Sequence, residues 1–178
     1  LYAMDVEKWT VTEEAQAPGK PWGATMLGDE LLVLLGMPPD DDRFVRHFVP
    51  GHGLRDEGGF QCPDNTGSHL SYDGDFIYVS QWYNKRILQL DRSGNPLREI
   101  PVPHEICGHT IVDGRFHCVT TDDEDSGEYW LTRVDARGER IVVEDLARIP
   151  FAARALAFDG RRYWTNHREK NETVAFEL

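Results

Sequence analysis

Short apolar runs alternate with polar turns along the whole chain, and the runs have the length of β-strands. Pairs of Asp and Gly separate two apolar runs in four places: Gly28-Asp29, Asp73-Gly74, Asp113-Gly114 and Asp159-Gly160. An Asp-Gly pair between apolar runs predicts a β-hairpin with a type I′ turn, because both residues tolerate the positive φ that this turn needs. The nearest candidate for a helix, residues 147–156, is interrupted by Pro150.

Each predicted hairpin is followed by a polar loop and further apolar runs. Third strands are predicted at Arg43–Phe48, Arg86–Leu90, Tyr129–Val134 and Thr173–Leu178, and fourth strands at Leu97–Val102 and Arg140–Glu144. Four antiparallel strands that recur every roughly 40 to 45 residues are typical of a β-propeller blade. We therefore predict one all-β domain, a β-propeller of about four four-stranded antiparallel blades. The predicted blades are residues 21–65, 66–106, 107–150, and 151–178 together with 1–18.

The pattern at the two ends of the chain does not determine whether one chain closes the ring. Residues 1–18 predict a third and a fourth strand, and this N-terminal segment could supply the missing outer strand of the last blade, since exposed sheet edges have to be covered. However, Leu1–Met4 and Val174–Leu178 both have the pattern of third strands, so one of them is surplus. The alternatives are a closed ring in one chain, a piece of a larger propeller, and a homo-oligomer in which chains complete a larger ring. Because the chain begins with Leu, we expect a trimmed or processed N-terminus.

The composition and net charge of the chain disfavour some classes of binding partner. The 178 residues carry 19 Lys and Arg against 31 Asp and Glu, a net charge of −12, which disfavours nucleic acid and anionic membranes as partners. The longest apolar run, Leu31–Leu35, is too short to span a bilayer. The three cysteines, Cys62, Cys107 and Cys118, form no CxxC motif and are too few for a disulfide scaffold, so a cytoplasmic location is the default expectation.

Two stretches of the chain resemble the NHL-repeat family of β-propellers. Gly51–Pro63 looks like the Gly-rich connector that precedes a blade of that family, and Ile77–Asp91 is similar to its second strand, Asn-x-Arg loop and third strand. The chain departs from the pattern at Gln81, where the family usually has an acidic residue, and it has fewer blades. The resemblance implies the propeller fold, whereas function has to come from the site, because propellers host many unrelated functions.

His69 and His109 occupy the same repeat position, four residues before the Asp of their turns. Inner strands line the channel of a propeller, so we expect both imidazoles near the axis, as metal ligands or as packed core residues. Imidazole suits zinc and similar divalent metals. NHL-type peptidylamidoglycolate lyases carry channel histidines that bind a catalytic metal, and the resemblance implies such a metal here. A third ligand is not evident, although His167 and Asp122 are candidates. Cys118, the predicted cross-strand partner of His109, is a further candidate, with a buried structural role as its alternative.

Three functions are compatible with these patterns. The first is the binding of a small ligand or peptide at the channel mouth, through Gln81, Trp82, Tyr83 and Thr121 on the loops that follow the second strands. The second is a metal-dependent lyase or hydrolase. In it Arg154 neutralises a substrate anion, and His167 or Asp122 transfers a proton. The repeat position of the two histidines falls in the fourth blade on Ala155, or on Arg154 if a one-residue bulge intervenes. The third is a scaffold that assembles into a larger ring.

Overall fold

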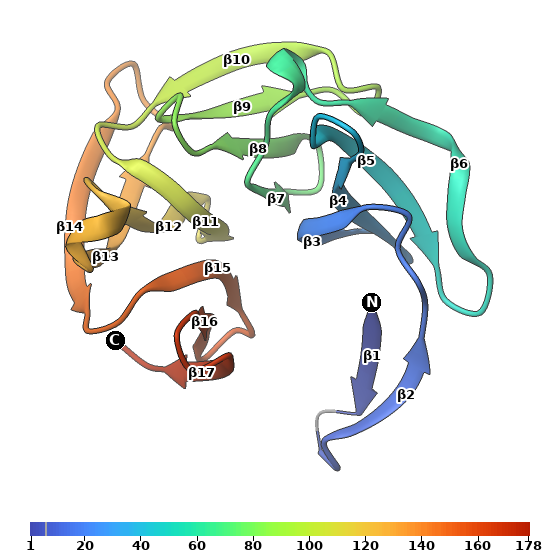
Figure 1. The fold of residues 1–178 in the computed structure, drawn as a ribbon. Helices are drawn as coiled ribbons and strands as arrows, with labels where there is room; N and C mark the ends of the chain where they lie inside the picture. The colour runs from blue at the N-terminus through green and yellow to red at the C-terminus, as the bar shows by residue number, and fades with distance from the viewer. Residues whose placement is uncertain (6) are drawn as a thin grey trace.

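The computed structural model describes residues 1–5 and 7–178, which form a β-propeller with its blades arranged around a central axis (Figure 1). The first three blades have four antiparallel strands each. The first blade consists of β3 (Lys20–Leu27), β4 (Glu30–Met37), β5 (Asp42–Val49) and β6 (Gly53–Gln61). The second consists of β7 (His69–Tyr72), β8 (Ile77–Gln81), β9 (Arg86–Leu90) and β10 (Pro96–Pro101). The third consists of β11 (Glu105–Val112), β12 (Arg115–Thr121), β13 (Tyr129–Asp135) and β14 (Val142–Ile149). The all-β propeller predicted from the repeats is thus confirmed.

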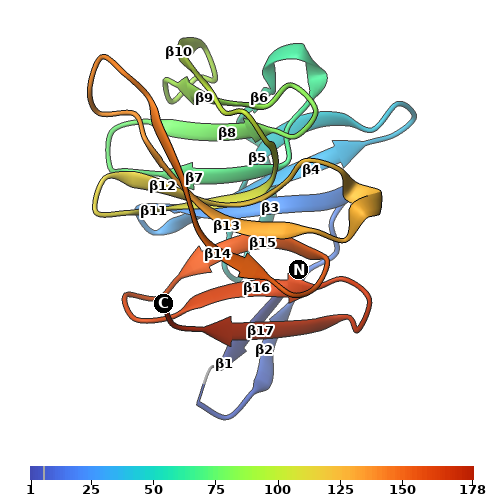
Figure 2. The same ribbon diagram turned by 90° about the vertical axis from the view of Figure 1, so that its left-hand side faces the viewer.

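The last blade has three strands, β15 (Ala153–Phe158), β16 (Tyr163–His167) and β17 (Glu172–Phe176), and a separate hairpin joins β1 (Tyr2–Asp5) to β2 (Thr10–Glu14). Two 3-10 turns, η1 (Pro63–Asn65) and η2 (Glu124–Ser126), lie between strands. Figure 2 shows the blades from the side. Among the described residues, no helix has the length and apolarity needed to cross a membrane.

The apolar core lies between neighbouring blades. Leu34 of the first blade packs with Leu70 of the second, and Ile87 of the second packs with Ile106 of the third. Leu131 and Leu156 continue the core between the third and fourth blades. This arrangement follows from the strand pattern, because each blade has to bury its apolar positions against the next blade.

The hairpin turns use Asp and Gly in two ways. Asp113 and Gly114 have φ values of 49° and 71°, as a type I′ turn requires. At the equivalent position in the second blade, Asp73 instead accepts backbone N–H bonds from Asp75 and Phe76 through Oδ1 and a Tyr78 hydroxyl bond through Oδ2. Asp159 of the last blade accepts the same set of bonds from Arg161, Arg162 and Trp164. The type I′ prediction is therefore right in the third blade, whereas Asp73 and Asp159 organise wider turns with their side chains.

The Gly-rich stretch of residues 51–63 follows the third strand of the first blade. It contains the outer strand β6 and is not only a connector. β6 pairs with β5 from Phe44–Gln61 to Val49–Gly53, with a register shift between Val45 and His47. Gly58, at φ 77°, lies in the shifted segment, and its carbonyl is 3.0 Å from Nε2 of His47. Glycine accepts this backbone geometry, so the same residues that suggested a flexible loop allow a bulged outer strand.

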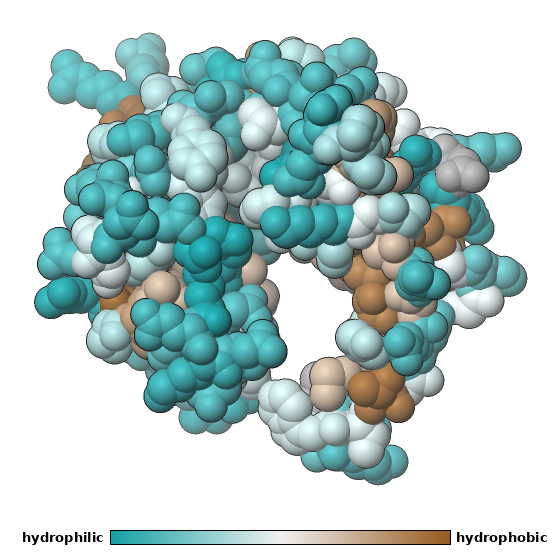
Figure 3. Space-filling view, in the orientation of Figure 1, coloured by the Kyte–Doolittle hydropathy of each residue, from teal (hydrophilic) through white to brown (hydrophobic). Residues whose placement is uncertain are grey.

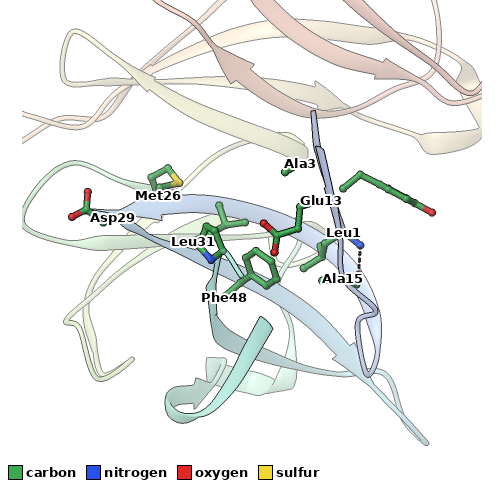
Figure 4. A pocket seen from close by; sticks show the side chains of 10 residues that line it. Leu1, Ala3, Glu13, Ala15, Met26, Asp29, Leu31 and Phe48 are labelled. Atoms are coloured by element: carbon green, nitrogen blue, oxygen red, sulfur yellow. Dashed lines mark hydrogen bonds between the residues drawn. The ribbon is translucent and has the colours of Figure 1, made fainter. Parts of the chain in front are cut away.

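The N-terminal hairpin packs against the first blade and does not complete the last one. The Leu1 ammonium donates a 2.8 Å hydrogen bond to the Ala15 carbonyl, and both residues pack against Val33, Leu35 and Phe48. Figure 4 shows the pocket of about 200 Å³ that remains between the hairpin and this blade. The expectation that residues 1–18 supply an outer strand to the last blade is therefore wrong. β1 and β2 pair with each other in a sheet of their own, and β17 pairs with β16.

Side chains meet at the junction between the N-terminal hairpin and the last blade, which we call the seam. Trp9, in the turn between β1 and β2, lies 6.2 Å from Trp164 of β16, measured between ring centroids. In the part of the chain that the structure describes, β17 pairs only with β16. The space-filling view shows an open channel at the centre of the ring (Figure 3).

Candidate functional site

The two predicted channel histidines come together, as their repeat position suggests. The His69 and His109 rings are 5.5 Å apart between centroids and meet edge to face. His109 is fully buried, and its Nε2 is 2.8 Å from the Ser71 hydroxyl. Burial lowers the pKa of His69 to about 4 and holds the pKa of His109 well below its ordinary value. Both rings are therefore neutral at pH 7, and the Nδ1 atoms of both are buried without a hydrogen-bond partner.

The histidine pair does not fit a catalytic metal centre. Neutral imidazoles with free nitrogen atoms are good ligands, but a catalytic zinc normally takes three protein ligands. The described residues contain no group of three or more His, Cys, Asp or Glu side chains placed to hold a metal ion. We therefore derive no chemical step through a metal at His69 and His109. His69 also borders a hollow of about 250 Å³, with Ala24, Trp164 and Asn166 among its other walls.

A bulge at the start of β15 places Arg154 on the mouth of the channel. The register between β15 and β16 shifts between Arg154 and Ala157, and Ala155 within the bulge has φ 63°. A left-handed conformation is costly for a residue with a Cβ, and such strain is often found where a protein directs a side chain to a site. Gly108 on the neighbouring inner strand leaves the space into which the Ala155 backbone fits.

Arg154 reaches from the last blade to the first two. Its Cζ atom lies 4.8 Å from the ring centroid of Trp82, which follows β8, and 5.6 Å from that of Trp22, in β3. Both distances are those of cation–π contacts. Its side chain is 30% exposed, yet its Nε atom is buried and has no acceptor. The mouth thus contains a guanidinium that is oriented by two indoles and retains an unused hydrogen-bond donor.

Two carboxylates from the third blade complete this group. Glu105 accepts a 2.7 Å hydrogen bond from the Trp82 indole N–H. Glu124, on η2, accepts a 3.3 Å hydrogen bond from Nη2 of Arg154, and the same Oε1 atom accepts one from Arg168. We call these six residues, Trp22, Trp82, Glu105, Glu124, Arg154 and Arg168, the mouth cluster. All four blades contribute to it.

The other predicted ligand residues divide between the interior and the surface. Gln81 is fully buried; its amide N–H bonds the Pro63 and Thr66 carbonyls, and its Oε1 accepts from Asn84 and Arg86. Thr121 is fully buried as well, and its hydroxyl bonds the backbone of its own loop. Tyr83 is 75% exposed and lies 6.1 Å from Trp82 between ring centroids. Of these four predicted residues, Trp82 belongs to the mouth cluster and Tyr83 flanks it.

The predicted proton-transfer residues have other partners. His167 stacks on Phe151 with 4.4 Å between ring centroids and an angle of 7°. Asp122 is exposed, and its Oδ1 lies 2.6 Å from Nδ1 of His104. Cys118 pairs with His109 across the two strands, as predicted, but burial raises the pKa of its thiol, so it stays protonated. The structure thus places Arg154 at the mouth, the histidine pair in the interior, and His167 and Asp122 in contacts of their own.

Four members of the mouth cluster were not singled out from the sequence: Trp22, Glu105, Glu124 and Arg168. A weak signal existed for Trp22, since a Trp at the first residues of an inner strand has to sit at the channel rim. For Glu124 the acidic run Asp122–Asp125 concealed the one carboxylate that points to two arginines.

Comparisons with known proteins support the fold. No protein-family model matches the chain, and no curated protein matches it by sequence. Glutaminyl cyclase from Myxococcus xanthus superposes with a TM-score of 0.66 at 14% identity, over 90% of this chain and 66% of that one. The nidogen/laminin complex gives 0.65 at 12% identity, over 98% of this chain and 84% of that one. An inactive virginiamycin B lyase from Staphylococcus aureus, solved with quinupristin, gives 0.53 at 11% identity, over 90% and 56%. At these identities the likeness is one of fold. The propeller expected from the NHL resemblance is found, and the chain spans only 66% and 56% of the cyclase and the lyase.

Proposed function

We propose that this chain is a ligand-binding propeller whose site is the mouth cluster and whose ligand is a small molecule or a short peptide segment. The observation that carries the proposal is the position of Arg154, which crosses to Trp82 and Trp22 and keeps a buried N–H without an acceptor. A buried donor without a partner costs about 1 to 3 kcal/mol, so its presence favours an acceptor that arrives from outside. Aromatic faces and one oriented charge at the end of a channel are typical of a ligand site.

Binding is favoured over catalysis by the state of the reactive groups. Burial lowers the pKa of His69 and His109 and raises that of Cys107 and Cys118, so the two imidazoles are weak proton acceptors and the two thiols stay protonated. The neighbours in fold include enzymes and a protein complex, and either role is compatible with the propeller. The mouth cluster supplies guanidinium hydrogen-bond donors beside two indoles, and these donors can orient a ligand.

The test uses three probes that each carry one phenyl ring: phenylacetate, phenylacetamide and benzylamine. We expect at least one of them to change the intrinsic tryptophan fluorescence of the protein in a saturable titration, because Trp22 and Trp82 lie in the site. Arg154→Gln and Trp82→Leu should each weaken that binding about tenfold, since each removes a contact worth roughly 1.4 kcal/mol.

Arg161→Gln is the matched control. Arg161 is 79% exposed, pairs with Glu177 and follows the turn at the other end of β15, so its loss should leave binding within twofold of the original. Circular dichroism and the urea midpoint show whether each variant is folded. Saturable binding that survives both Arg154→Gln and Trp82→Leu, or the absence of binding by all three probes, contradicts the proposed site.

A further inference from the structure

The mouth cluster already holds a carboxylate, and it belongs to the protein. Glu124 lies on η2, a turn that begins after Asp123 and ends at Gly127, where φ is 68°. The Asp123 side chain accepts a hydrogen bond from the Asp125 N–H and fixes the turn. The turn thereby brings the Glu124 carboxylate to Arg154 and Arg168, which come from β15 and from the residue after β16.

The bond between Glu124 and Arg154 is incomplete. A guanidinium offers parallel N–H groups that match both oxygens of a carboxylate, and such bidentate pairs are the strong ones. Here one oxygen of Glu124 meets Nη2 of Arg154 at 3.3 Å, while Nε of Arg154 is buried and unpaired. A carboxylate that could approach Nε and Nη2 together would satisfy both donors, which Glu124 does not do from its turn.

Release of Glu124 from Arg154 leaves no isolated charge. Arg168 bonds the same Oε1 atom, so the Glu124 carboxylate keeps a cationic partner when Arg154 is taken by another anion. This matters because the loss of the only cationic partner of a partly buried carboxylate would oppose the exchange. The Glu124 side chain is 33% exposed, which lets it turn toward Arg168 and solvent.

A cationic ligand is disfavoured by the same contacts. Cations bind at sites of this kind by lying on the faces of aromatic rings. Arg154 lies over the rings of both Trp22 and Trp82, and Lys20 and Arg43 also lie over the Trp22 ring, at 4.3 and 4.0 Å from its centroid. A further cation would meet these charges.

We infer that the ligand of the mouth cluster carries a carboxylate, and that Glu124 is an internal carboxylate that this ligand displaces from Arg154. The inference rests on the proposed function and adds the ligand's chemical class and a built-in competitor. The ligand carboxylate takes Nε and Nη2 of Arg154, and the group next to it lies beside Trp82 and the exposed Tyr83. Glu124 holds Arg154 in place until the ligand arrives and lowers the affinity by competing with it.

The first experiment compares phenylacetate with phenylacetamide, which differ in charge and keep the same ring. Titrations followed by tryptophan fluorescence at pH 7 should give phenylacetate a Kd at least tenfold lower. Equal affinity for the two probes overturns the carboxylate class and leaves the proposed binding site intact. Failure of phenylacetate to bind also overturns it, whereas the proposed function is decided by whether any of the three probes binds and depends on Arg154 and Trp82.

The second experiment removes the competitor. Glu124→Gln should lower the Kd for phenylacetate about threefold to tenfold, because Arg154 then has no competing charge. Asp125→Asn makes the same change in net charge one residue along the turn, so a general electrostatic effect would appear equally in both variants. Equal effects of the two substitutions, or weaker binding by Glu124→Gln in a folded protein, overturn the displacement of Glu124.

Discussion

Replacing Gly108 with alanine is expected to lower the free energy of unfolding by about 3 kcal/mol, at the upper end of the usual cost of overpacking. A Cβ atom at Gly108 would lie 2.4 Å from the Cα, 2.6 Å from the carbonyl carbon and 2.8 Å from the nitrogen of Ala155. All three are backbone atoms of the neighbouring inner strand, so no side-chain rotation relieves the overlap. The third and fourth blades would have to move apart, and the core between them would lose its packing.

Gly138 provides the control for Gly108. It lies in the loop between β13 and β14, and a Cβ there has only backbone atoms of Arg140 near it, at 3.9 and 4.0 Å. Gly138→Ala should therefore change the free energy of unfolding by less than about 0.5 kcal/mol. Urea denaturation of the two variants at one pH gives the comparison. Similar midpoints for both would show that the inner strands do not approach each other as closely as described.

Acidification from pH 7 to pH 5 is expected to destabilise the protein through its buried histidines. The pKa of His69 is lowered to about 4, and that of His109 is held well below its ordinary value, in both cases first by burial. In the unfolded chain both residues titrate near pH 6.5. Below that pH the unfolded state therefore binds more protons than the folded state, and stability falls as pH falls. His69 should contribute a loss of about 2 kcal/mol at pH 5, and His109 adds a loss of the same sign.

The histidine contribution is isolated by substitution. His69→Gln removes one titrating group, so the loss of stability between pH 7 and pH 5 should shrink by about 2 kcal/mol relative to the original protein. His52→Gln, which removes an exposed histidine of the turn before β6, is the control substitution. His117, whose pKa is also lowered, contributes equally to all three proteins and cancels in the comparison. Parallel slopes for the His69 variant and the original protein would contradict the buried, neutral state of this ring.

The fold could be predicted from the sequence because short, local patterns of residues determine its hairpins. An Asp-Gly pair between apolar runs determines a hairpin, and four such hairpins at a regular spacing leave few folds other than a propeller. The details that the pattern missed depend on side chains. Asp73 and Asp159 make wider turns in which they accept side-chain hydrogen bonds from Tyr78 and Trp164, whereas Asp113 makes the type I′ turn.

The site was less predictable because it joins residues from all four blades. The repeat position of His69 and His109 predicted their proximity, and the structure shows it. Whether a side chain on the last blade reaches the first two depends on the number of blades and on the direction that the Ala155 bulge gives to Arg154. Neither is encoded in the spacing of one repeat. Glu124 illustrates the same limit, since its role comes from two arginines distant in sequence.

The indole pair at the seam has a consequence for how the ring opens in solution. Trp9 and Trp164 meet across the junction of the hairpin and the last blade, and Trp9 is 61% exposed. Opening there separates two side chains without breaking a backbone ladder, whereas opening between other blades exposes a full apolar interface. We therefore expect the ring to open transiently at the seam. The amides of β17 and of the N-terminal hairpin should exchange with deuterium before those of β7 and β8. A large molecule could then enter the channel from the side, between blades.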